Sequence, residues 1–198
     1  MRHFEAFAGL YSQGFQPSRD LVKIGVVNQT TMLASDTQEI VDYLRGVMMQ
    51  HYDLDEQSIT SHFADTRDTL CYATNDNQSA TYGMLAESAD LAIVAGGYNS
   101  SNTSHIVDLC AEKLPTYFIN SSDKLISNEL ISHFNYHQKQ AMLSANYLPQ
   151  KEKVRIMLTC GASCPDAVVE DIFRKLVSFF PDAQAVDQVV EAWLQAQA

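Results

Sequence analysis

Two features of the sequence predict an α/β fold with mostly parallel sheets. Short apolar runs alternate along the chain with helical patterns, and a polar turn follows most of the apolar runs. Alternation of this kind favours right-handed βαβ units, in which neighbouring strands run parallel. Because the plan repeats, we expect two similar α/β lobes, at residues 1–67 and 68–180, and a C-terminal helix within residues 181–198.

In the first lobe the spacing predicts two helices and two short strands. Residues 4–11 carry apolar side chains at helical spacing, and Gly14 ends that helix. A turn at residues 17–20 precedes a strand at residues 21–27. Ser35 caps the second helix, whose apolar face is expected to consist of Ile40, Leu44, Val47 and Met48. Residues 51–57 are predicted to form a loop, and residues 58–63 a second strand.

The second lobe alternates more regularly. The predicted strands cover residues 90–95, 115–120 and 154–158, and the predicted helices cover residues 77–88, 102–113, 126–134 and 165–179. Residues 138–147 are predicted to be weakly helical or looping. Residues 186–196 form the last helix, which we expect to pack down through Val189, Val190, Trp193 and Leu194.

Charge and composition argue against several classes of function. The chain has 198 residues and a net charge of −11, whereas nucleic acid or an anionic membrane calls for clustered Lys and Arg. No apolar run approaches the roughly 18 residues that cross a membrane, and the N-terminus lacks the apolar core of a signal peptide. We therefore expect a cytoplasmic protein with no membrane or nucleic-acid partner.

Residues 90–108 contain the strongest signal for a binding site. A predicted strand ends at Gly96-Gly97, five hydroxyl or amide side chains follow at residues 99–103, and a helix begins among them. Free N–H groups and the helix dipole then favour an anion, although capping and turn formation alone would also explain these residues. Similar polar loops occupy residues 28–31, 68–74 and 159–164. Ligands bind beyond the carboxyl ends of parallel strands, so four such loops predict one anion pocket built from neutral donors.

Three of the four cysteines lie in these polar loops. Cys71, Cys160 and Cys164 are the three, whereas Cys110 lies on an apolar helix face and is expected in the core. Without a secretory signal a disulfide framework is not expected. Metal or redox chemistry and plain buried thiols both remain open, including a site that combines all three loop cysteines.

Four motifs occur in order along the chain: QTT at residues 29–31, DTLCYAT at 68–74, GYNSSNT at 97–103 and GASCPD at 161–166. In order and separation they resemble the 4-hydroxy-3-methylbut-2-enyl diphosphate reductases, the LytB family of iron–sulfur enzymes. The opening stretch at residues 15–32 resembles the plant and cyanobacterial branch, and the resemblance extends over most of residues 4–180. It implies the second and third lobes of a three-lobed trefoil.

The resemblance also implies a reaction and a set of site residues. The family reduces its allylic diphosphate with two electrons and protons, giving isopentenyl and dimethylallyl diphosphates in the non-mevalonate isoprenoid pathway. The resemblance implies a 4Fe–4S cluster with Cys71 as one ligand. It also implies that Thr30 and Thr31 lie near the substrate alcohol, with Thr30 as a catalytic group. Thr74 would be a further pocket hydroxyl. The diphosphate-binding groups would be Ser100, Ser101, Asn102 and Ser163.

The sequence departs from the family in ways that change the expectation. No counterpart of the first lobe, which carries two cluster cysteines, is present, and Cys160 and Cys164 stand where the family has small or hydroxyl residues. We expect the chain alone to keep part of the diphosphate site without an intact cluster or turnover. A non-redox diphosphate-binding module is the alternative. For the complete enzyme we expect an electron donor such as ferredoxin or flavodoxin. We also expect a homodimer that forms through the position of the absent lobe, and, in a eukaryote, a location in the plastid stroma.

Overall fold

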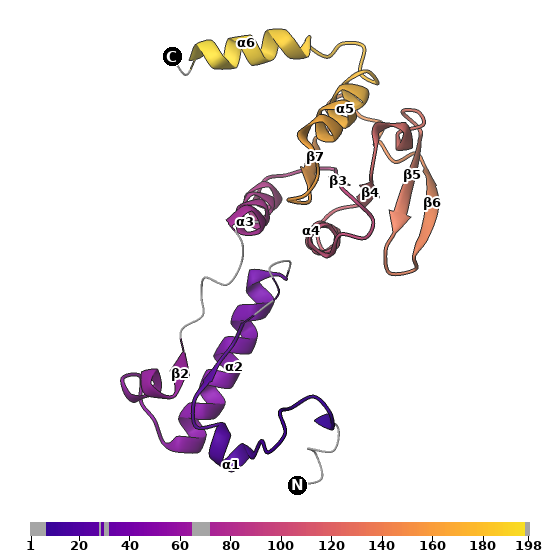
Figure 1. Cartoon of the computed structure of the whole chain (residues 1–198). Coiled ribbons are helices and arrows are strands. Elements are labelled where there is room, and N and C mark those ends of the chain that lie inside the picture. The colour runs from indigo at the N-terminus through magenta and orange to yellow at the C-terminus, as the bar shows by residue number, and fades with distance from the viewer. Residues whose placement is uncertain (1–6, 28, 30–31, 65–71, 197–198) are drawn as a thin grey trace. The chain divides into compact units, whose positions relative to one another are not determined.

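The computed structural model describes residues 7–27, 29, 32–64 and 72–196. The chain divides into two compact units, and each is described by itself (Figure 1). The first unit is Met1–Thr30 with Ala34–Thr69, and the second is Thr31–Leu33 with Leu70–Ala198. Within the described residues, no helix combines the length and the apolar character needed to cross a membrane.

The first unit is built on one long helix and a minimal parallel sheet. Helix α2 (Ala34–Tyr52) buries Met48 against Ile59 and Phe63. Strands β1 (Ile24–Gly25) and β2 (Phe63–Ala64) pair in parallel. A core of this size buries little apolar surface, so the unit gains modest stability from it.

Several predictions for the first unit are wrong in detail. Residues 58–61 form a 3₁₀ helix, η2 (Ser58–Ser61), because the Asp55 carboxylate accepts from Ser58 N at 2.8 Å and favours a helical turn over a strand. The predicted turn at 17–20 is a single helical turn, α1 (Pro17–Asp20), with proline in its first turn. Phe7 belongs to a 3₁₀ helix and residues 8–14 form turns and bends where part of an α-helix was predicted; residues 4–6 lie outside the described residues.

The apolar face predicted for α2 is only partly buried. Met48 is buried and Leu44 packs against the same core, but Ile40 and Val47 are 45% and 43% exposed. Among the described residues of the unit, two short strands accompany this helix, and they leave the outer part of the apolar stripe uncovered.

The second unit contains a three-stranded parallel sheet in the order β4-β3-β7. These strands are Thr116–Ile119, Leu91–Ala95 and Ile156–Cys160. All five residues of β3 are buried, as expected for a central strand covered on both faces. Ala95 is in register with both Ile119 and Cys160, so the carboxyl ends of the strands lie level. The predicted α/β class with parallel sheets is confirmed.

Helices cover both faces of this sheet. Ala92 and Val94 pack with residues of α3 (Tyr72–Ala86) and α4 (Ser101–Ala111). The alternate residues Leu91, Ile93 and Ala95 pack with α5 (Asp166–Val177). Since successive strand residues point to opposite faces, the second unit is a three-layer α/β/α sandwich.

The predicted helix at 126–134 is wrong, and so is the helical or looping segment at 138–147. These residues contain an antiparallel hairpin, β5 (Leu130–Asn135) and β6 (Gln140–Ala145), which contacts β4 (Figure 1). Ile131 and Phe134 fit a helical spacing, but they pack into different clusters on opposite sides of the strand. Lys139 closes the turn with a φ of 54°.

Three other elements differ in extent or packing. Helix α3 begins at Tyr72, five residues before the predicted start, and β7 runs to Cys160, so Thr74 and Cys160 lie within regular elements. Helix α6 (Val186–Ala196) is present as predicted, but the side chains expected to pack down remain 45–58% exposed. Its apolar face is therefore largely exposed, with Val189 and Val190 lining a pocket together with Phe173 of α5.

Candidate functional site

Two loops meet at the carboxyl edge of the β4-β3-β7 sheet. The loops follow β3 and β7, which are adjacent strands. Gly161 N donates to Ala95 O at 3.0 Å, and Gly96 N donates to Ile119 O at 3.0 Å. These bonds hold the first residue after each strand beside its neighbour, in the position where parallel α/β sheets bind ligands.

Thr103, in the first turn of α4, packs between the two glycines at these strand ends. A Cβ added at Gly96 would lie 2.7 Å from Thr103 Oγ1, and one added at Gly161 would overlap the same oxygen. Any larger residue at either position would push α4 away from the sheet. The two glycines therefore allow the start of α4 to lie close against the ends of β3 and β7.

The first turn of α4 presents neutral donors. Ser100 is its N-cap, and Ser100 Oγ accepts from Thr103 N at 3.3 Å. No acidic residue lies in the first turn. The remaining N–H groups of this turn and the positive end of the dipole make it a favourable position for an anion, despite the net charge of −11.

Asn102 carries the clearest sign that the site binds a ligand. Its side chain is only 4% exposed, and neither Nδ2 nor Oδ1 has a hydrogen-bond partner in the described part of the chain; the same is true of the buried Thr103 Oγ1. Leaving a buried amide unsatisfied costs about 1–3 kcal/mol, and native structures rarely retain such groups without a ligand, water or functional reason. A bound anion would accept from Nδ2 and offset that cost.

Helix α3 also borders the candidate site, beside α4 and the loop after β7. Asn77 Nδ2 donates to Cys160 O at 3.1 Å, and Thr81 Oγ1 lies 3.3 Å from Thr159 Oγ1. These contacts fix the middle of α3 against the end of β7. Thr74 is 3% exposed and lies three residues before Asn77, on the same side of the helix.

The described site residues of the prediction come from three segments at this one edge. Ser100, Ser101 and Asn102 begin α4, Thr74 lies in the first turn of α3, and Ser163 is exposed in the loop between β7 and α5. Thr30, Thr31 and Cys71 lie outside the described residues. That these side chains form one anion site stays a prediction.

Some residues of this edge were not singled out by sequence reasoning. Thr103 and Asn77 shape the site, and the loop after β4, residues 120–124, ends at the same edge because β4 is parallel to β3. That loop repeats the polar pattern, with Ser121 and Asp123 hydrogen-bonded to each other. The recurrence of polar residues after the strand predicted at 115–120 is the signal that could have found it.

The cysteines fall into two environments. Cys110 is fully buried, as predicted, and burial raises its pKa to about 11. Cys160 and Cys164 are partly exposed, and burial also raises the pKa of both thiols. Among the described residues, no three His, Cys, Asp or Glu side chains are grouped to hold a metal ion. A site that also uses Cys71 stays a prediction.

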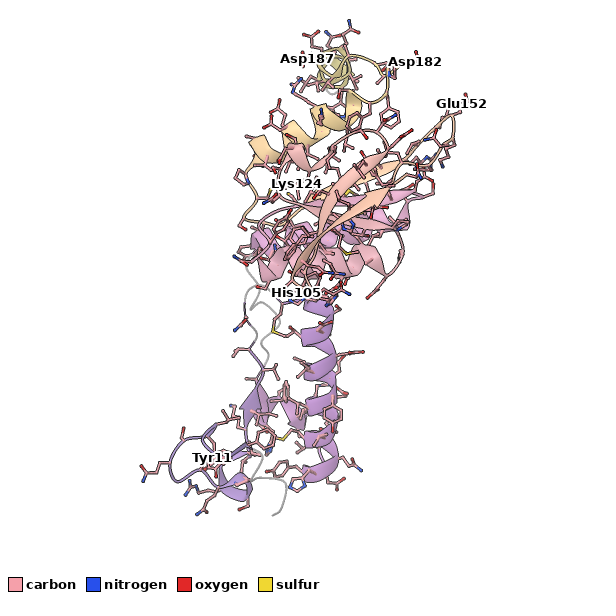
Figure 2. The ribbon with its side chains drawn as sticks, turned by 90° about the vertical axis from the view of Figure 1, so that its right-hand side faces the viewer. Tyr11, His105, Lys124, Glu152, Asp182 and Asp187 are labelled. Atoms are coloured by element: carbon pink, nitrogen blue, oxygen red, sulfur yellow. The ribbon has the colours of Figure 1, made fainter. Side chains whose placement is uncertain are left out.

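The titratable side chains near this edge include His105. It lies on the second turn of α4, half-buried, and is labelled in Figure 2. Figure 2 also labels Lys124, at the end of η3 (Ser122–Lys124), which pairs with Asp123 at 3.1 Å. The Lys124 ammonium, at the end of the loop after β4, is thus already paired with a neighbouring carboxylate.

Comparisons with known proteins agree with the geometry. The family model described as "LytB protein" matches residues 5–177. A Gloeobacter violaceus protein named 4-hydroxy-3-methylbut-2-enyl diphosphate reductase is 39% identical over 177 residues, covering 88% of this chain and 42% of that protein. A Thermosynechococcus vestitus protein with the same name is 40% identical over 171 residues, covering 86% and 41%. The chain thus spans about two-fifths of the length of these relatives.

A solved structure shares the fold. The E-1-hydroxy-2-methyl-but-2-enyl-4-diphosphate reductase of Plasmodium falciparum superposes with a TM-score of 0.51 at 20% identity, over 89% of this chain and 50% of that one. At this identity the likeness concerns the fold alone. It is consistent with lobes of a larger α/β protein.

Proposed function

Because the chain belongs to the LytB family, we propose that it supplies the diphosphate-binding part of a 4-hydroxy-3-methylbut-2-enyl diphosphate reductase. The complete protein would remove the allylic hydroxyl with two electrons and two protons, releasing water and forming isopentenyl or dimethylallyl diphosphate. The single observation that carries the proposal is the buried, unpartnered Asn102 amide at the start of α4.

The chain's own residues would bind the diphosphate through neutral donors. Asn102 Nδ2, the hydroxyls of Ser100 and Ser101, and the backbone N–H groups of the first turn of α4 would donate to phosphate oxygens. Ser163 would donate from the loop after β7. Hydrogen bonds to an anion are shorter and roughly twice as strong as neutral ones. Thr74 would line the same pocket, with Thr30 and Thr31 near the substrate alcohol and Thr30 in a catalytic role.

The described residues alone do not fit an iron–sulfur cluster. Such a cluster needs several thiolate ligands, and no group of three metal-binding side chains occurs among the residues that the structure describes. We propose Cys71 as one ligand of a 4Fe–4S cluster whose other ligands come from outside this chain. This chain's contribution to the reaction is accordingly substrate binding and orientation.

Binding of inorganic diphosphate tests the proposal directly. Titration calorimetry should detect binding to the unmodified chain, and S101A and S163A should each weaken it roughly 10- to 100-fold, the equivalent of about 1.5–3 kcal/mol for a hydrogen bond to a charged group. S178A, in the residue that follows α5, is the matched control and should bind as the unmodified chain does. Equal affinities for all four proteins would refute the assignment.

Turnover by this chain alone is expected to be absent. An assay with the allylic diphosphate and reduced ferredoxin or flavodoxin should yield no isoprenoid product, because a single proposed cluster ligand cannot hold the cluster. Activity should appear when a polypeptide carrying the missing lobe is added and iron and sulfide are reconstituted. A colourless mixture with intact diphosphate binding would instead favour a non-redox module, which the reductase names of the relatives do not favour. Measured reduction by this chain alone would contradict the prediction.

We further propose that the isolated chain forms a homodimer through its exposed apolar surface. Ile40, Tyr43 and Val47 lie on one side of α2 and are 45%, 72% and 43% exposed. Sedimentation velocity should show a concentration-dependent dimer that V47K weakens. Sedimentation as a monomer at high concentration would disprove the dimer without affecting diphosphate binding.

A further inference from the structure

Two thiols lie on either side of the Ser163 loop. Cys160 is the last residue of β7, and Cys164 precedes Pro165, the N-cap of α5. A turn joins them, with Cys164 N donating to Gly161 O at 2.8 Å. Each thiol lies close enough to the other to affect its pKa, and both are partly exposed and unpaired by any disulfide. Cys164 Sγ donates to Pro165 O at 3.8 Å.

The start of the loop between these thiols contacts two helices of the candidate site, α3 and α4. Cys160 O accepts from Asn77 Nδ2, and Gly161 packs against Thr103 of α4. Only Gly161, Ala162 and Ser163 separate the cysteines. A disulfide requires sulfur atoms about 2 Å apart and a narrow range of Cβ separations, so closing it would contract this loop and move Ser163.

We propose that Cys160 and Cys164 form a reversible dithiol–disulfide pair that weakens anion binding at the Ser163 loop when it closes. Its effect on binding rests on the proposed function. A low-molecular-weight disulfide such as oxidised glutathione is the oxidant. One thiolate attacks it and releases one glutathione thiol; the second cysteine then displaces the other, so two protein electrons reduce one glutathione disulfide to two thiols.

The surroundings predict slow oxidation that accelerates with pH. Burial, and after it nearby negative charge including Asp166, raises the pKa of both thiols, so few thiolates exist at neutral pH. Thiol–disulfide exchange proceeds through the thiolate, and its rate should therefore rise as the pH approaches the thiol pKa. Cys110 serves as an internal reference, because burial raises its pKa to about 11.

The test oxidises the full chain with oxidised glutathione, blocks remaining thiols, and maps disulfides by peptide mass spectrometry. We expect a Cys160–Cys164 disulfide, absent from C160S and C164S, and a roughly tenfold weaker affinity for inorganic diphosphate, about 1.4 kcal/mol, restored by dithiothreitol. The affinity of C164S should not respond to the oxidant.

Three results would overturn the pair. These are Cys160 and Cys164 both found blocked as free thiols after oxidation, a stable mixed disulfide of either one with glutathione, and a mapped Cys160–Cys164 disulfide that leaves diphosphate affinity unchanged. A reduced chain that binds no diphosphate would instead refute the proposed function and, with it, the regulatory effect. In that case the peptide map alone still decides whether the dithiol closes.

Discussion

G161A is expected to abolish measurable diphosphate binding and to destabilise the second unit. The added Cβ would overlap Thr103 Oγ1 and lie 3.0 Å from Thr103 Cβ. The Thr103 side chain, in the first turn of α4, is fully buried against the strand ends and cannot turn away. The first turn of α4 must therefore shift from the strand ends. Overpacking of this kind costs about 1–3 kcal/mol. Chemical denaturation should show the loss in free energy of unfolding, and calorimetry the loss of binding.

Gly97 offers a matched control one residue from the other glycine of the site. A Cβ there would meet no atom within 4 Å, so G97A should leave both stability and diphosphate affinity near their original values. The double variant T103A/G161A removes the overlapping hydroxyl and should recover part of the lost stability, a non-additivity expected of residues in contact. If G161A behaved like G97A, the close packing of α4 against the strand ends would not matter for the site.

The sheet was predictable where local pattern and tertiary environment agree. The run at residues 91–95 is apolar at every position and ends in two glycines, which suits a central strand buried on both faces. The hairpin at residues 130–145 was not predictable in this way, because the spacing of Ile131 and Phe134 fits a helix as well as a strand. The strand conformation is selected by pairing between β5 and β6 and by the contacts of β5 with β4. Both depend on residues that are distant in sequence.

The placement of several candidate residues at one sheet edge was predictable, whereas their role in binding stays a prediction. Repeated polar loops after strands indicated that Ser100, Asn102 and Ser163 would gather at one sheet edge, since parallel strands end together. The sequence does not reveal that Asn102 is buried without partners. That property depends on how closely α4 approaches the sheet, which Gly96 and Gly161 permit from different strands.

N102L is expected to separate stability from binding. Leucine has nearly the shape of asparagine but removes Nδ2 and Oδ1, both buried without partners in the unliganded chain. Removing an unsatisfied buried amide should leave the free energy of unfolding unchanged or raise it by about 1–3 kcal/mol. The same change deletes the proposed donor to the diphosphate, so affinity for inorganic diphosphate should fall roughly 10- to 100-fold. Denaturation and calorimetry on one preparation measure both effects.

T103V is the natural companion to this variant. It also removes a buried, unpartnered oxygen, Thr103 Oγ1, while keeping the branched shape that packs against the two glycines. If Asn102 is a ligand group and Thr103 a packing residue, T103V should match N102L in stability yet retain diphosphate affinity. A stability loss in N102L with unchanged affinity would mean that the Asn102 amide is a structural group, satisfied within the fold by water. Loss of a ligand group lowers affinity without lowering stability, whereas loss of a structural group lowers stability without lowering affinity. The pair of variants therefore distinguishes the two roles.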